Sequence, residues 1–139
     1  RYKSHPKFAV ISPDAGALKK IYPLAKALEC DVIEASKKRD VSTGAILSTH
    51  LDLTNVDINS YEALYVVDDI CDGGGTFIGL AKEIRAVNRD ALISLVVSHG
   101  IFSQGTNLEG IDKIYTTNSF KENGKYSNKV TQFDMKDMW

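Results

Sequence analysis

Short apolar segments alternate with amphipathic stretches along the chain, and this alternation is the feature that most constrains the fold. Residues 8–11, 63–67 and 92–97 are apolar runs with the length and composition of strands buried on both faces. Between them, apolar side chains recur at helical spacing over residues 18–28 and 77–87. Because strands that alternate with helices form βαβ units, we predict a three-layer α/β fold built on a doubly wound, mostly parallel sheet.

The other segments are less regular. Residues 31–35 and 111–116 are also predicted to be strands. Pro23 lies inside the first helical pattern, so we expect this helix to be kinked or to begin later than its apolar pattern suggests. Residues 36–60 mix a basic cluster, a glycine and scattered apolar residues, and we expect part of this stretch to be strand and part a mobile loop.

Charge and composition exclude several classes of protein. Lys and Arg number 17 and Asp and Glu 18, so the net charge of −1 argues against nucleic-acid binding through a basic surface. No apolar run approaches the roughly 20 residues of a membrane helix, and the polar start of the chain is unlike a signal peptide. Cys30 and Cys71 have no metal-ligand spacing, so we expect two reduced thiols. We therefore expect a single cytoplasmic domain over residues 1–139 that binds neither nucleic acid nor membrane.

Residues 68–76 carry most of the functional information. Successive glycines let backbone N–H groups surround one oxyanion, and the helix that begins near Thr76 adds its positive N-terminal end. Paired aspartates at the end of a strand can accept hydrogen bonds from a vicinal diol. Together these features predict a ribose 5-phosphate site formed by Asp68, Asp69, Asp72, Gly73, Gly74, Gly75 and Thr76.

A purely structural interpretation of this segment is a tight strand-to-helix turn in which Asp72 caps the helix. The segment is not a Walker A loop, which needs Gly-Lys-Ser/Thr, and its glycines lack the spacing of the dinucleotide-binding fingerprint. The combination of aspartates, glycines and a final threonine favours the ribose-phosphate interpretation over the structural one.

Three further features have ordinary structural interpretations. Asp14 follows Pro13 at a strand end, where an aspartate commonly caps the next helix. The basic residues 37–39 would be a solvated charge run on the sequence alone. His99 ends a buried strand, where a lone histidine is more often structural, and we leave it out of the catalytic set.

Four segments, in the same order, resemble the ribose-phosphate pyrophosphokinase family, which has the type I phosphoribosyltransferase fold. Residues 12–16 resemble its pyrophosphate loop, residues 37–39 its catalytic flexible loop and residues 68–76 its ribose-phosphate loop. Residues 98–103, Ser-His-Gly-Ile-Phe-Ser, resemble a segment that ordinary phosphoribosyltransferases lack, and the resemblance places them near the nucleotide site or a subunit contact.

The resemblance implies an activity and a role for each segment. The enzyme would transfer the diphosphoryl group of ATP to the 1-hydroxyl of ribose 5-phosphate and yield phosphoribosyl pyrophosphate and AMP. Lys37 and Arg39 would stabilise the group in transfer, Asp14 would help to bind a Mg²⁺ cofactor, and residues 68–76 would hold the sugar phosphate. It also implies that the chain is the C-terminal half of a two-domain enzyme that forms homo-oligomers, with the N-terminal domain missing here.

Two positions depart from the family pattern. Gly73 stands where the family usually has Thr or Ser, and Ala17 stands where it commonly has Gly, so we expect a changed affinity rather than a lost site. Two alternatives stay open. A nucleobase phosphoribosyltransferase would use the same loop, although no segment that would cover a base is evident. A non-catalytic homologue would bind ribose phosphates without turnover.

Overall fold

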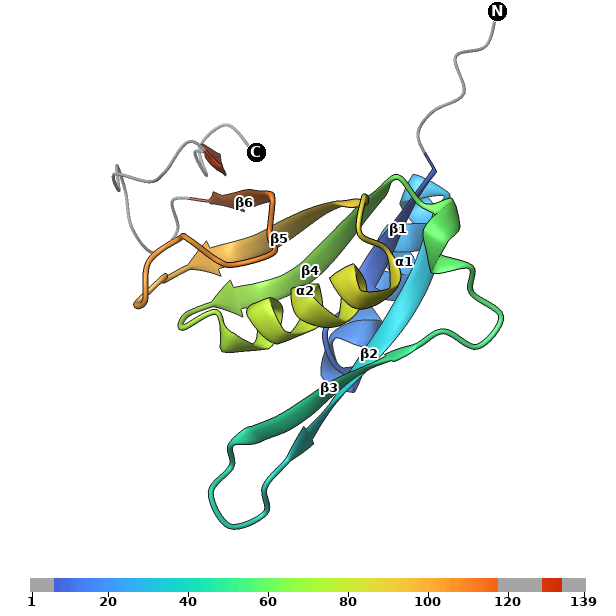
Figure 1. Cartoon of the computed structure of the whole chain (residues 1–139). Helices are drawn as coiled ribbons and strands as arrows, with labels where there is room; N and C mark the ends of the chain where they lie inside the picture. The colour runs from blue at the N-terminus through green and yellow to red at the C-terminus, as the bar shows by residue number, and fades with distance from the viewer. Residues whose placement is uncertain (1–6, 118–128, 134–139) are drawn as a thin grey trace, which may run out of the picture.

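The structure, a computed structural model, describes residues 7–117 and 129–133, and these residues form one seven-stranded sheet with two α-helices (Figure 1). The elements in chain order are β1 (Phe8–Ser12), η1 (Ala15–Ala17), α1 (Leu18–Leu28), β2 (Asp31–Arg39), β3 (Ile46–Asp52), η2 (Ile58–Ser60), β4 (Ala63–Cys71), α2 (Gly75–Val87), β5 (Leu92–Gly100), β6 (Lys113–Thr117) and β7 (Val130–Phe133).

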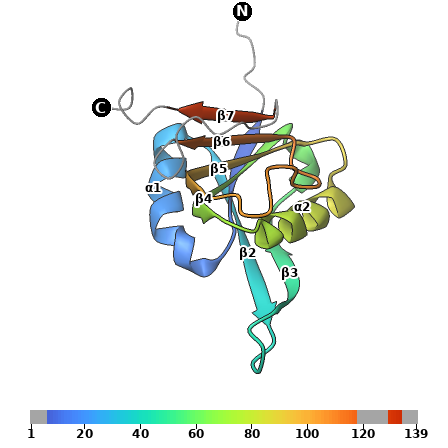
Figure 2. The same ribbon diagram turned by 90° about the vertical axis from the view of Figure 1, so that its left-hand side faces the viewer.

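The order of the strands across the sheet is β3-β2-β1-β4-β5-β6-β7. Only β2 and β3 are antiparallel, and every other neighbouring pair is parallel. The crossover through α1 leads from β1 to β2, whereas the crossover through α2 leads from β4 to β5, in the opposite direction across the sheet. Because parallel crossovers are right-handed, the two helices lie on opposite faces of the sheet, as Figure 2 shows. The predicted three-layer, doubly wound α/β fold is confirmed.

Helix α2 covers one face of the sheet with the apolar stripe predicted for it. Phe77, Leu80 and Ile84 are at most 4% exposed and pack in the main core with strand residues of β1, β4 and β5. Val87, the last residue of the predicted stripe, is 40% exposed. The stripe therefore packs against the sheet along most of the helix, and its buried part ends one turn before the C-terminus of the helix.

Helix α1 covers the other face less completely. Ile21 and Ala25 are buried, but Tyr22, Leu24 and Leu28, which belong to the same predicted pattern, are 36% to 48% exposed. The helix begins before Pro23 and continues through it, so the expectation of a later start is wrong. Glu29, the C-cap residue after the helix, adopts the left-handed conformation that commonly ends a helix, with φ 55°.

Strands β2 and β3 form a hairpin that projects from the body of the sheet (Figure 1). Residues 37–39, expected in a mobile loop, instead continue β2, because β3 pairs with them and satisfies their backbone hydrogen bonds. The register shifts between Lys38 and Arg39, where the pairing is irregular. Ala35 and Leu51, at the base of the hairpin, are buried in the main core, so the hairpin is anchored to the body.

Within the described ranges, neither helix combines the length and the apolar character that crossing a bilayer requires.

Replacing Leu80 by Ala should destabilise the fold strongly, because its side chain is fully buried between α2 and the sheet. Truncation of a buried leucine costs about 2–5 kcal/mol through lost burial and the cavity left behind. Val87→Ala, in the same helix but exposed, is the matched control and should cost less than about 1 kcal/mol. Urea unfolding followed by circular dichroism measures both, and equal losses would contradict the assigned core.

Candidate functional site

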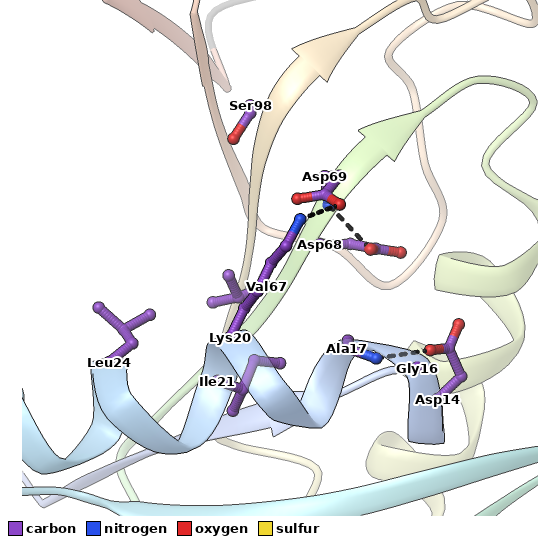
Figure 3. A pocket seen from close by; sticks show the side chains of 10 residues that line it. All are labelled: Asp14, Gly16, Ala17, Lys20, Ile21, Leu24, Val67, Asp68, Asp69 and Ser98. Atoms are coloured by element: carbon purple, nitrogen blue, oxygen red, sulfur yellow. Dashed lines mark hydrogen bonds and ion pairs between the residues drawn. The ribbon is translucent and has the colours of Figure 1, made fainter.

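The candidate site lies at the carboxyl ends of β1 and β4, which are neighbours in the sheet, with β4 as its central strand. The chain leaves these neighbouring strands toward opposite faces, through α1 and α2, so a crevice opens between the two connections. A cavity of about 390 Å³ occupies this place. Its polar lining comes from three segments distant in sequence (Figure 3), namely Asp14 and Lys20, Asp68 and Asp69, and Ser98.

The paired aspartates belong to the last part of β4 rather than to the loop after it. Successive side chains of a strand point to opposite sides, and Figure 3 shows that Asp68 and Asp69 diverge in this way. The Asp69 carboxylate reaches toward α1, where Oδ2 lies 2.5 Å from Nζ of Lys20. The Asp69 backbone N–H donates to Oδ1 of Asp68 at 2.8 Å. The two carboxylates therefore present acceptors on two sides of the strand end.

The surroundings of Asp68 shift the pKa of its carboxyl group. Burial raises the pKa of its carboxyl, and the negative charges of Asp14 and Asp69 raise it further. The hydrogen bond from the Asp69 N–H and the charge of Lys37 lower this pKa but do not cancel the rise. Burial and neighbouring negative charges leave this carboxylate less well solvated than an exposed one. Hydrogen bonds from the hydroxyl groups of a ligand would therefore stabilise it.

Asp14 has two partners within the site. Its Oδ1 accepts a hydrogen bond from the Ala17 N–H at 3.1 Å, so the capping role expected for it is present, at the start of η1. Its Oδ2 lies 3.4 Å from Nζ of Lys37, whose side chain is only 14% exposed. The pair connects the turn after β1 to the second half of β2.

The structure does not bring Lys37 and Arg39 together. Lys37 reaches inward to Asp14, whereas Arg39 lies farther along the hairpin and donates to the carbonyl of Gly44 at 2.9 Å. The irregular register between Lys38 and Arg39 accounts for the difference, because a bulge changes the direction of the side chains that follow it. Of the two predicted catalytic residues, Lys37 is thus the one in contact with the cluster of carboxylates.

The glycine segment forms the turn between β4 and α2. Gly74 is the N-cap of α2 and has φ 86°, a left-handed conformation that glycine adopts readily. A Cβ on Gly74 would lie 2.5 Å from Cδ2 of Leu108, so the backbone also passes close to its neighbour. The first turn of α2 contains no acidic residue, and its first N–H groups have no partner inside the helix. These are the properties of an anion-binding helix N-terminus.

At Gly73 the departure from the family pattern has a simple structural meaning. A Cβ there would meet only Cγ of Gln104 at 3.9 Å, an ordinary contact, so the site has room for a serine or threonine side chain. What this chain lacks at the position is the hydroxyl and not the space for it.

Residues 98–103 form hydrogen bonds to the residues directly before the glycines. The backbone N–H groups of Ile101 and Phe102 both donate to the carbonyl of Cys71, at 2.9 and 3.2 Å, and Ser103 donates to Asp72. Phe102 packs over Gly100, where a Cβ would lie 2.2 Å from the ring. The segment was expected near a nucleotide or a subunit contact, and within the described residues it holds the turn after β4 in place.

Two of the polar lining residues were not predicted as site residues from the sequence. Lys20 lies among several lysines of α1, and Ser98 was noted only as part of a motif. The sequence could have predicted the place of Lys20. It stands near the start of the helix that follows the first strand, and the first residues of such a helix lie at the carboxyl edge of the sheet.

The described residues contain no group of three or more metal-binding side chains placed around one point. Mg²⁺ is commonly held by one or two carboxylates together with phosphate oxygens and water. Asp14 and Asp68, close enough that the charge of one raises the pKa of the other, supply hard oxygen donors of the right kind. The residues thus fit an ion that arrives with phosphate groups and is only partly held by this chain.

Comparison with known proteins gave relatives by sequence and by structure, whereas no protein-family model matches the chain. A ribose-phosphate pyrophosphokinase of Mycoplasmopsis pulmonis is 39% identical over 118 residues, which are 81% of this chain and 35% of that protein. The crystal structure of phosphoribosylpyrophosphate synthetase from Mycobacterium smegmatis superposes with a TM-score of 0.74 at 18% identity, over 96% of this chain and 42% of that one. A xanthine-guanine-hypoxanthine phosphoribosyltransferase of Helicobacter pylori superposes with a TM-score of 0.54 at 14% identity, over 93% of this chain and 70% of that one.

These structural matches, and the crevice between the connections that follow β1 and β4, define the class of protein. The chain has the type I phosphoribosyltransferase fold. Within that class the sequence is more specific. The chain is a homologue of the ribose-phosphate pyrophosphokinases, and it spans about a third of the length of the curated relative described above.

Gly74→Ala should destabilise the chain by about 1–2 kcal/mol, because alanine is strained at this left-handed φ. Its Cβ would also displace Leu108. Gly75→Ala is the matched control: it opens α2, nothing lies within 4 Å of the added Cβ, and alanine favours a helix. Thermal unfolding of both variants measures the difference, and a Gly74→Ala variant as stable as Gly75→Ala would contradict the assigned turn.

Proposed function

We propose that the chain forms the ribose 5-phosphate and pyrophosphate half of a ribose-phosphate diphosphokinase of the cytoplasm. The observation that carries the proposal is the convergence of three features at one sheet edge. These are the glycine turn at the N-terminus of α2, the half-buried carboxylate of Asp68 in the strand before it, and the Lys37–Asp14 pair. The 39% identity to a ribose-phosphate pyrophosphokinase supports this assignment over others within the same fold.

In this proposal each element binds one part of the sugar phosphate. The 5-phosphate accepts hydrogen bonds from the N–H groups of residues 73–76 and from the Thr76 hydroxyl. Asp68 accepts hydrogen bonds from the ribose hydroxyls, and Asp69 supports it from the α1 side. Asp72 begins the turn, and its carbonyl is held by Ser103.

The proposed reaction needs no protein nucleophile. The 1-hydroxyl oxygen of ribose 5-phosphate attacks the β-phosphorus of ATP, so a C1–O–Pβ link forms while the bond from Pβ to the oxygen bridging it to Pα breaks. AMP leaves with that oxygen, and the hydroxyl proton is released to solvent. Catalysis then depends on positioning and on neutralising charge in the transferred group. Lys37 supplies positive charge at the cluster, and Arg39 would have to exchange its bond to Gly44 for the polyphosphate.

When bound, Mg²⁺ would neutralise part of the phosphate charge and orient the diphosphoryl group. Asp14 is the residue we expect to hold it from this chain. Because the chain spans 35% of its pyrophosphokinase relative, we propose that a second domain, N-terminal to this one, supplies the adenine contacts and that the complete enzyme is a homo-oligomer.

Asp68→Asn should weaken the binding of ribose 5-phosphate by about 10- to 100-fold, the usual effect of losing hydrogen bonds to a charged acceptor. Asp90→Asn, an exposed aspartate beyond the C-terminus of α2, is the matched control and should leave the affinity unchanged. Isothermal titration calorimetry of both variants of the 139-residue chain measures the effect. No binding of ribose 5-phosphate by the unmodified chain would refute the proposal.

The activity itself is tested with the complete protein. Supplied with ATP, Mg²⁺ and ribose 5-phosphate, it should release AMP and phosphoribosyl pyrophosphate, whereas the 139-residue chain alone should bind the sugar phosphate and turn over little. Binding without turnover by the complete protein would favour the non-catalytic alternative. Transfer of phosphoribosyl groups to nucleobases would favour the phosphoribosyltransferase.

A further inference from the structure

The side chain of Gln104 lies beside the glycine turn that we propose for the 5-phosphate. Gly73 brings only backbone groups to this turn, because it has no side chain. Among the described residues, its chain neighbours aside, the heavy atom nearest to a Cβ built on Gly73 is Cγ of Gln104, at 3.9 Å. The space that a side chain at position 73 would enter is therefore bordered by a residue of the connection between β5 and β6.

The backbone of Gln104 is tied to the residues directly before the glycines. The N–H of Ser103 donates to the carbonyl of Asp72 at 3.1 Å. The N–H of Gly105 donates to the carbonyl of Phe102 at 2.9 Å, which closes a β-turn. Ser103 and Gln104 are the central residues of this β-turn. These hydrogen bonds hold the Cα of Gln104 at a fixed place beside the glycine turn, while its side chain is exposed.

The amide of Gln104 is a hydrogen-bond donor without an assigned role. Within the ranges that the structure describes, no hydrogen bond or ion pair engages it. Its nitrogen lies two bonds beyond Cγ and carries two N–H groups. The terminal torsion of a glutamine side chain has a broad distribution, so the nitrogen can reach the space over Gly73 at little cost.

A phosphate at the glycine turn would have acceptors to spare. Residues 68–76 contain no Lys or Arg, so this segment offers a phosphate only backbone N–H groups and the hydroxyl of Thr76. A phosphate group has three strongly accepting oxygen atoms, each able to take more than one hydrogen bond. A donor from a second segment would therefore add to the binding instead of competing with the turn.

We propose that Gln104 is a further binding residue for the 5-phosphate. Its amide N–H donates to a phosphate oxygen beside Gly73 and takes the place of the hydroxyl that this position lacks. The phosphate is then held between the turn before α2 and the β-turn after β5. The inference rests on the proposed function and adds to it a specific contact from the connection between β5 and β6.

Two substitutions of Gln104 separate its donor from its shape. In Gln104→Ala, the affinity for ribose 5-phosphate should fall about three- to tenfold, the scale of one hydrogen bond. Gln104→Glu keeps the shape but puts a negative charge beside the phosphate, so the affinity should fall further. Asn107→Ala removes an exposed amide from the same connection and is the matched control, with no change expected. Calorimetry on the 139-residue chain measures all three.

A hydroxyl returned to position 73 should replace the amide. Gly73 does not have a left-handed φ, and a Cβ there meets only an ordinary contact, so the position has room for a serine side chain. In the Gln104→Ala background, Gly73→Ser should restore most of the lost affinity. Gly73→Ala, which adds the Cβ without the hydroxyl, should restore none of it.

NMR observes the contact directly. In the ¹⁵N-labelled chain, the side-chain amide signals of Gln104 are assigned by their absence in Gln104→Ala. They should shift when ribose 5-phosphate is added and stay in place when ribose is added. A residue that only supports the fold would not distinguish the two sugars.

The outcomes separate this inference from the proposed function. If Gln104→Ala and Asn107→Ala bind alike while the unmodified chain binds ribose 5-phosphate, the role of Gln104 is wrong and the function stands. A Gln104→Glu chain that binds as tightly as the unmodified one, or a Gly73→Ser change that restores nothing, would also overturn the role. If the unmodified chain does not bind ribose 5-phosphate, both proposals fail together.

Discussion

The parallel pairing of β1 with β4 is the constraint on which the site depends. The pairing places Ile11 beside Val66, so the two strands end at the same edge of the sheet. Because the connection after β1 turns to one face and the connection after β4 to the other, a cavity remains between them. Asp14, which follows β1, and Asp68, at the end of β4, meet across this space even though more than fifty residues of sequence separate them.

Rigidity around this edge comes from elements that do not line the cavity. The turn after β4 is held by hydrogen bonds from Ile101 and Phe102, and the close packing of Phe102 over Gly100 fixes that segment in turn. The backbone donors of the turn are thus placed before any ligand arrives, which lowers the cost of ordering on binding. By contrast, the side of the sheet under α1 keeps apolar side chains such as Leu24 and Leu28 partly exposed. The chain spans about a third of the length of its pyrophosphokinase relative.

The alternation of apolar runs and amphipathic stretches was enough to predict the layers and the parallel sheet, because both depend on burial periods that are visible in the sequence. Three aspects depended on tertiary contacts and were missed. Asp68 and Asp69 extend β4 instead of following it, since β5 continues to pair with the strand beyond Val67. Residues 37–39 are strand and not loop, since β3 supplies partners that propensity does not reveal. Lys20 belongs to the cavity only because α1 crosses beside the end of β4. The roles of the predicted site residues stay predictions.

The central claim is that residues 73–76 bind the 5-phosphate of ribose 5-phosphate while Asp68 binds the sugar. A titration of the ¹⁵N-labelled chain with ribose 5-phosphate, followed by NMR, observes every amide of this turn separately. The account predicts that the largest shifts fall on the amides of residues 73–76, with smaller shifts at Asp68 and Asp69, and that ribose without phosphate leaves the turn unshifted. Saturable shifts centred elsewhere on the chain, with residues 73–76 unaffected, would contradict it.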